Sequence, residues 1–219
     1  MKKIILITAT IVSAFYSFGQ DADPVGMIPT DEDGSKREKK VRFSPYAGRA
    51  FPTQVFWGDT HVHTGNSLDA RGFGATLGFE DAYRFATGEE VVSSSGVPMK
   101  LSRPLDWLVI ADHSDGMGAM NEIIKGNPQL IGDPQLRKWH NQFNEGGEAA
   151  FQATMDVINA FSQGNMPAPA VDPSFVKTIW DKYLKTAEAY NDPGRFTAMI
   201  GYEWTSTEDG NNLHRNVLY

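Results

Sequence analysis

The pattern of apolar and polar residues along the chain predicts three strands, each of which ends in polar residues. The first covers residues 54 to about 63, and its alternation places on one face Val55, Trp57, Asp59, His61 and His63. The second, 106–113, is almost continuously apolar, which suits a strand covered on both faces in a parallel sheet. The third, 196–203, runs from apolar residues into an acid, and Gly201 would leave room for a bulky group beside Glu203.

Apolar residues recur with helical spacing between these strands. A glycine-rich stretch after the first strand predicts a loop over the site, and residues 79 to about 87 predict a helix. Between 114 and 195 the periodicity is helical in three segments, at about 133–145, 146–163 and 174–190. Such a connection is longer than an ordinary link between a strand and a helix. We therefore expect an α/β fold with a helical insertion, at about 114–195, over the mouth of the site.

The last residues predict a fourth strand that returns beside the third. A turn that contains Asp209 and Gly210 leads to His214 and to an apolar end at 216–219. If this segment runs antiparallel to the third strand, His214 begins where Glu203 ends. The two side chains would then lie at the same edge of the sheet.

The first 50 residues predict export. Lys2 and Lys3 precede an apolar run that ends in small residues, which is the pattern of a secretory signal peptide over residues 1–19. The run is too short, and too soon followed by acidic residues, for a membrane-spanning anchor. Residues 20–50 are polar and predict a solvated linker or N-terminal arm. We therefore expect a periplasmic or secreted protein with no stable membrane anchor after cleavage.

Composition narrows the possible chemistry. The chain has no cysteine, which excludes disulfides and thiol nucleophiles and leaves only nitrogen and oxygen atoms as metal ligands. Without the two lysines of the predicted signal peptide, 18 basic residues face 27 acidic ones, and the formal charge changes from −7 to −9. An acidic protein disfavours non-specific binding to nucleic acid. We expect no nucleic-acid partner.

The ends of the predicted strands carry residue types that bind metals. His61 and His63 are separated by one residue, so on a strand they point the same way, about 6.6 Å apart along the backbone, and both can reach one ion. Two solvated rings on a surface strand are the alternative. The other strand ends carry His113, Glu203 and His214. Because functional groups gather at the carboxyl ends of parallel strands, these endings together predict a site for zinc, manganese or iron.

These motifs resemble those of the PHP (polymerase and histidinol phosphatase) superfamily. The similar segments are 61–64 with Ser67 and Asp69 after it, 110–113, 201–203 and 213–214. Over about 51–219 the pattern is most similar to a PHP-like family of exported bacterial proteins described only as a domain of unknown function. The resemblance implies two or three divalent metal ions.

The resemblance also implies a set of site residues. It assigns as metal ligands His61, His63, His113, Glu203 and His214. Asp69 stands where many members carry another ligand, and it is a candidate for ligation or catalysis. Asp112 precedes a ligand histidine but faces the other way by strand alternation, so it would either orient that histidine or serve the structure alone.

The fold that the resemblance implies is a distorted seven-stranded β/α barrel, related to the TIM barrel. Barrels usually need about 250 residues. The superfamily closes its site with a late Asp-x-His pair, and none follows His214 here. We therefore expect residues 51–219 to form an incomplete barrel, truncated at its C-terminus. The chain would be an N-terminal fragment of a longer protein and would bind metal poorly by itself.

The function that these features favour is a metal-dependent hydrolase, specifically a phosphoesterase that acts on a small anionic ester with a metal-activated water. The chain has no Gly-x-Ser-x-Gly nucleophile elbow. An amidohydrolase-like enzyme or a sulfate-ester hydrolase also fits the motifs. A non-catalytic binding module with structural metals is the alternative from another class.

Overall fold

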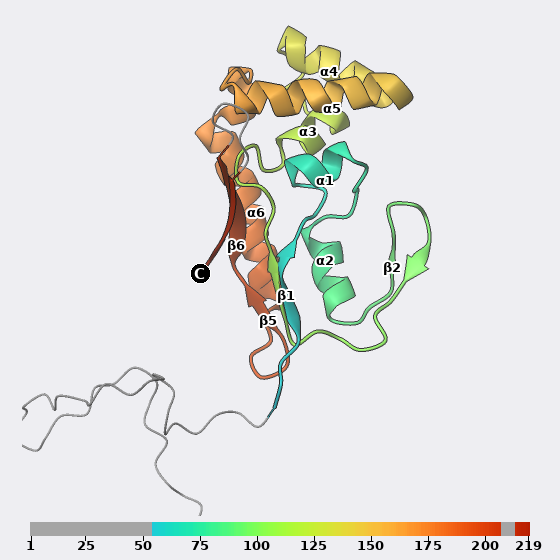
Figure 1. Ribbon diagram of the computed structural model, residues 1–219, viewed down its shortest axis with the longest axis vertical. Coiled ribbons are helices and arrows are strands. Elements are labelled where there is room, and N and C mark those ends of the chain that lie inside the picture. The colour runs from blue at the N-terminus through green and yellow to red at the C-terminus, as the bar shows by residue number, and fades with distance from the viewer. Residues whose placement is uncertain (1–53, 207–212) are drawn as a thin grey trace, which may run out of the picture. The chain divides into compact units, whose positions relative to one another are not determined.

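The computed structural model describes residues 54–206 and 213–219 (Figure 1). Contacts divide the chain into Met1–Val55 and Phe56–Tyr219, and the elements below all lie in the second unit. The strands are β1 (Gly58–Val62), β2 (Val91–Val92), β3 (Pro98–Met99), β4 (Trp107–Ile110), β5 (Thr197–Met199), β6 (Gly201–Ser206) and β7 (Leu213–Leu218). The helices are α1 (Leu68–Gly72), α2 (Phe79–Ala86), α3 (Ala119–Lys125), α4 (Pro134–Glu145), α5 (Gly147–Ser162), the 3-10 helix η1 (Ala168–Val171) and α6 (Pro173–Tyr190).

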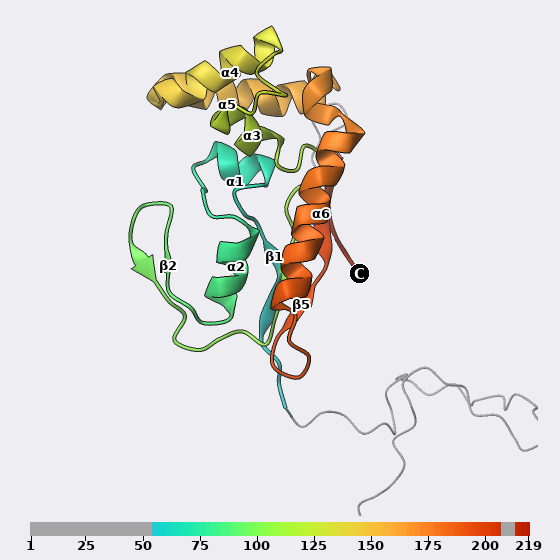
Figure 2. The same ribbon diagram turned by 180° about the vertical axis from the view of Figure 1, so that it is seen from behind.

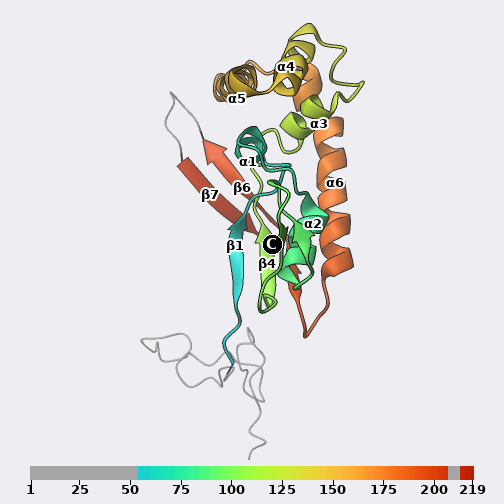
Figure 3. The same cartoon turned by 90° about the vertical axis from the view of Figure 1, so that its right-hand side faces the viewer.

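A small parallel sheet brings the predicted strand ends together. Its order is β1-β4-β5, and the chain continues from β5 into β6. Glu203 in β6 forms a parallel bridge with His113, which follows β4. The strand β7 pairs antiparallel with β6, with His214 opposite Thr205, so the predicted return of the last segment is confirmed. The ends of β1 and β4 therefore lie together beside β6, and the start of β7 lies beside the end of β6 (Figure 3).

Two helices cover one face of this sheet. Apolar residues of α2 and α6 form one core with the facing residues of β4 and β5, as the view from behind shows for α6 (Figure 2). Tyr183 of α6 is fully buried there. Its hydroxyl donates to the carbonyl oxygen of Ile110 at 3.0 Å and accepts from the amide of Gly201 at 3.1 Å. These bonds join α6 to β4 and to the start of β6.

The helical insertion forms a second core beyond the carboxyl ends of the strands. Buried residues of α3, α4, α5 and η1 pack there with Leu68 of α1. Asp133 begins α4 as its N-cap, because its carboxylate accepts from the amides of the first turn, and Pro134 follows at a position that needs no amide. The last helix within the predicted insertion (114–195), α6, contributes to both cores, because Phe175 packs in this second core and Tyr183 packs with the sheet.

The expectation of an incomplete seven-stranded β/α barrel is wrong. The seven described strands are divided among the three-stranded parallel sheet and two antiparallel hairpins, β2-β3 and β6-β7. A barrel needs a continuous ring of hydrogen-bonded strands. Within residues 54–206 and 213–219, β1 pairs only with β4, so the sheet stays open along β1. The fold is a mixed α/β arrangement with no closed barrel.

Two sequence predictions fall on the N-terminal part of the chain. The predicted signal peptide, 1–19, and the linker or arm, 20–50, lie outside the described residues. No helix in the described part of the chain is long and apolar enough to span a membrane.

Candidate metal centre

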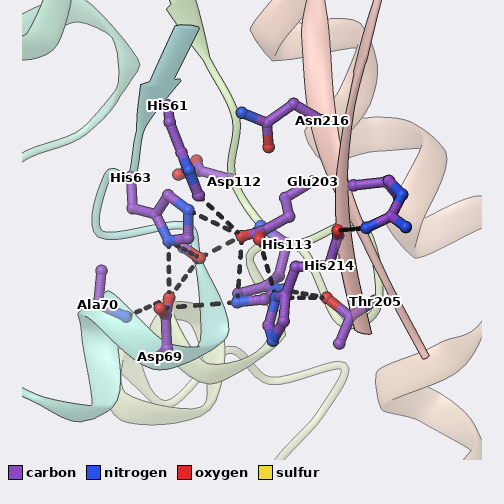
Figure 4. Close-up of polar contacts among 12 residues, drawn as sticks. His61, His63, Asp69, Ala70, Asp112, His113, Glu203, Thr205, His214 and Asn216 are labelled. Atoms are coloured by element: carbon purple, nitrogen blue, oxygen red, sulfur yellow. Dashed lines mark hydrogen bonds and ion pairs between the residues drawn. The ribbon is translucent and has the colours of Figure 1, made fainter. Parts of the chain in front are cut away.

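Five predicted ligands converge at the edge where the strands end (Figure 4). His61 lies in β1 and His63 directly after it, His113 follows β4, Glu203 lies in β6 and His214 in β7. The His61 and His63 ring centroids are 4.9 Å apart, and His113 lies 5.2 Å from both His63 and His214. The structure therefore brings all five into one cluster, as their positions in the sequence predict.

Glu203 is the centre of this cluster. Its side chain is 3% exposed. Its Oε2 lies 3.2 Å from His61 Nε2, 3.0 Å from His63 Nε2 and 3.5 Å from His113 Nε2. Its Oε1 lies 2.8 Å from His214 Nδ1. Four imidazoles from three strands thus surround one buried carboxylate.

Asp69 joins the cluster from α1, a helix in a stretch that the sequence predicts as a loop. Its Oδ1 lies 3.0 Å from His63 Nδ1 and accepts a hydrogen bond from Ser67 at 2.6 Å. Its Oδ2 lies 3.6 Å from His113 Nε2. Asp69 is therefore placed either to ligate a metal with His113 or to orient His63 through its Nδ1.

The side chains fit a metal ion. Three overlapping groups each have ligand atoms within 4.8 Å of one another, namely His61-His63-Glu203, His63-Asp69-His113 and His113-Glu203-His214. His63 Nε2 and Glu203 Oε2 are buried and have no hydrogen-bond partner, although they lie 3.0 Å apart. Unpaired buried polar atoms are costly, and a cation between them would satisfy both. All the ligand atoms are nitrogen or oxygen.

A comparison with known families assigns most of the chain. Residues 50–219 match the family described as "Protein of unknown function (DUF3604)". The chain belongs to this family. The description of the DUF3604 family gives neither a reaction nor a connection to the PHP superfamily. No curated protein and no solved structure matches the chain.

In this DUF3604 protein, charges within the cluster shift the pKa values of Asp69, His63 and His113. Burial opposes ionisation of Asp69, but hydrogen bonds with His113, His63 and Ser67 outweigh it and hold the pKa of Asp69 well below its usual range. Burial also opposes protonation of His63 and His113. Their hydrogen bonds and charge interactions with Asp69, and the charge of Glu203, outweigh that effect and raise the pKa of both.

Asp112 forms its hydrogen bonds with Thr64 rather than with a ligand side chain. It is fully buried, and its two oxygens accept from the amide and the hydroxyl of Thr64 at 2.5 and 2.6 Å. Burial raises the pKa of Asp112 to about 6 against these hydrogen bonds. The described residues give it no hydrogen bond to a histidine ring. These hydrogen bonds join the segment after β1 to the segment after β4.

Three more polar residues lie at the site without a role predicted from the sequence. The buried hydroxyl of Ser67 is 3.1 Å from His63 Nδ1 and accepts from the amide of His113 at 3.2 Å. The hydroxyl of Thr205 is 2.6 Å from His113 Nδ1. Asp115 has one buried oxygen without a hydrogen-bond partner, and burial raises its pKa. The sequence pattern could have placed Thr205 at the site, because strand alternation puts it on the same face as Glu203.

Proposed function

We propose that the protein is an exported metal-dependent hydrolase that acts on small phosphate esters. The observation that carries this proposal is the cluster itself, in which imidazoles and carboxylates surround one buried glutamate and leave two buried polar atoms unpaired. A buried carboxylate needs positive charge close by. A metal ion supplies that charge and uses the neutral imidazoles as ligands.

Two or three ions of zinc, manganese or iron suit the arrangement. The three ligand groups overlap at shared residues, and their donors are imidazole nitrogens and carboxylate oxygens. When bound, such ions lower the pKa of a water toward 7 and stabilise negative charge on the attacking and leaving oxygens of an ester. This chemistry matches the hydrolysis of an anionic ester.

The side chains of the site have separate tasks in this proposal. The histidines and Glu203 hold the ions, and Asp69 either ligates or orients His63. The chain has no cysteine, and the hydroxyls of Ser67 and Thr205 are engaged with imidazole nitrogens. We therefore infer that water is the attacking group.

The PHP-like motifs support phosphate as the esterified group, and the N-terminal sequence pattern supports export. A sulfate ester presents a similar tetrahedral group of oxygens with less negative charge. An amide substrate would present an uncharged, planar reacting group to the site. These three substrate classes can be compared directly with chromogenic compounds.

The test is a metal-depletion assay on the full chain. The protein is dialysed against a chelator, reconstituted with manganese or zinc, and assayed on p-nitrophenyl phosphate, p-nitrophenyl sulfate and p-nitroacetanilide. We expect turnover of the phosphate that is lost on chelation and restored by the metal. The variant Glu203→Gln should lose metal and turnover by more than the roughly 10–100-fold that follows removal of an outer partner. Glu188→Gln, at an exposed position of α6, is the matched control and should behave as wild type.

Other results would contradict parts of the proposal. Undiminished turnover in excess chelator would exclude the metal mechanism. Metal-dependent turnover of the sulfate alone would keep the mechanism and replace the substrate class. Tight metal binding with no turnover of any ester would favour a non-catalytic binding module.

A further inference from the structure

A histidine can bind a metal through one ring nitrogen only when the proton of the neutral ring sits on the other nitrogen. The hydrogen bond at that second nitrogen decides which tautomer forms. His113 therefore needs a partner for one of its nitrogens that leaves the other free for an ion.

The carboxylates near His113 favour the Nε2-protonated tautomer, which cannot bind a metal through Nε2. Its Nε2 faces two carboxylates, Asp69 Oδ2 at 3.6 Å and Glu203 Oε2 at 3.5 Å. Carboxylates accept hydrogen bonds, so they attract the ring proton to Nε2. A proton on Nε2 would remove the lone pair that a metal at this cluster requires.

Thr205 counteracts this attraction from the other side of the ring. Its Oγ1 lies 2.6 Å from His113 Nδ1, and residues 54–206 and 213–219 provide no other hydrogen-bond partner for that nitrogen. A hydroxyl oxygen has two lone pairs and can accept the Nδ1 proton. The same Oγ1 lies 3.5 Å from His214 Nδ1, a nitrogen that also lies 2.8 Å from Glu203 Oε1.

The strand β6 carries both the ligand Glu203 and the hydroxyl of Thr205. Glu203 and Thr205 are two residues apart and share one face, so the ligand and the hydroxyl have a fixed spacing. The side chain of His113 is only 9% exposed, so water has little access as a substitute for Thr205.

We propose that Thr205 is a positioning residue that holds His113 in the Nδ1-protonated tautomer and so presents Nε2 to the metal. This inference rests on the metal centre of the proposed function. Ser67 and Asp69 stand in the equivalent place at His63, whose Nδ1 they contact while Nε2 faces Glu203.

The first measurement is zinc affinity, by competition with a chromophoric chelator, for wild type and three variants. Thr205→Val keeps the shape and the strand preference of the residue but removes the hydroxyl, and should weaken zinc binding about 10–100-fold. Thr205→Ser keeps the hydroxyl and should restore most of the affinity. Thr197→Val, at an exposed position of β5, is the matched control and should bind zinc as wild type.

The second measurement reads the tautomer in the metal-free protein and needs no activity. A long-range proton–nitrogen correlation spectrum, recorded at a pH where the rings are neutral, resolves the five histidines of the chain. We expect the Nδ1-protonated form of His113 in wild type and in Thr205→Ser, and the Nε2-protonated form in Thr205→Val.

The outcomes separate this inference from the proposed function. Wild-type zinc affinity in Thr205→Val, or an unchanged His113 tautomer, would overturn the role of Thr205 while the metal centre stands. A wild-type protein that binds no zinc would overturn the metal centre. The tautomer spectrum would still decide whether Thr205 controls the His113 ring.

Discussion

At the scale of the residue, the site depends on the compensation of one buried charge. Glu203 is buried and has no lysine or arginine within ion-pair distance in the described structure. Its neighbours are imidazoles, whose charge depends on pH. In the metal centre that we propose, ions would compensate the carboxylate, and protons on His63 and His113 would do so in the metal-free protein. Protons and metal ions therefore compete for the same nitrogens.

This competition predicts that metal binding releases protons. The folded-state pKa values of His63 and His113 are raised above the usual 6.5 because the neighbouring carboxylates outweigh burial. Protonation of these rings stabilises the metal-free protein below pH 6.5, and that contribution is lost as the pH rises through the raised values. Near neutral pH the rings are still partly protonated, so zinc must displace protons.

Calorimetry in two buffers with different heats of ionisation measures this release. We expect net proton release at pH 6.5–7, which decreases as the pH rises above the raised pKa values, while the apparent zinc affinity increases. Zinc binding with no proton release across this range would show that the histidines are not the ligands.

At the scale of the element, long and regular patterns were predictable and short ones were not. The helices α4, α5 and α6 lie within one or two residues of their predicted ranges, because many apolar residues define each helical face. The helix α1 has five residues and lies in a glycine-rich stretch, where tertiary contacts outweigh a weak local preference. The same holds for the two-residue strands β2 and β3.

The candidate site was predictable for the same kind of reason. In the strands predicted from the sequence, His61, His63, His113 and Glu203 each lie at or near the carboxyl end, and such ends converge in an α/β sheet. The hydrogen bonds of Asp112 with Thr64 and of His113 with Thr205 join segments distant in sequence. Spacing along the chain contains no information on such contacts, so the sequence leaves two roles for Asp112 open.

The start of β6 requires glycine at position 201. A methyl group there would lie 2.6 Å from Val109 Cγ1 and 2.8 Å from the carbonyl oxygen of Val217. We expect Gly201→Ala to lower the free energy of unfolding by about 1–3 kcal/mol, because the β7 backbone cannot move away easily.

Urea denaturation of the two alanine variants Gly201→Ala and Gly132→Ala measures this effect. Gly132 is exposed and its added methyl group would meet only the Pro128 carbonyl oxygen, at 4.0 Å. The control should change stability by no more than about 0.5 kcal/mol. Equal stability of both variants would contradict the described packing of β6 on β4.

At the scale of the whole molecule, an open sheet and a helical insertion together frame the ligand cluster. The helices α2 and α6 cover one face of the sheet, and α1 carries Asp69 to the strand ends beneath the insertion. Convergence of the ligands needs only the neighbouring ends of β1, β4, β6 and β7. For this reason the predicted cluster forms here although the predicted barrel does not.

The most direct test of the metal centre is anomalous diffraction at the zinc edge from crystals of the zinc-loaded protein. The account predicts anomalous peaks about 2.0–2.2 Å from imidazole nitrogens and carboxylate oxygens of the cluster, with Glu203 bound to at least one ion. Zinc found only at surface positions, with Glu203 still enclosed by metal-free imidazoles, would contradict it.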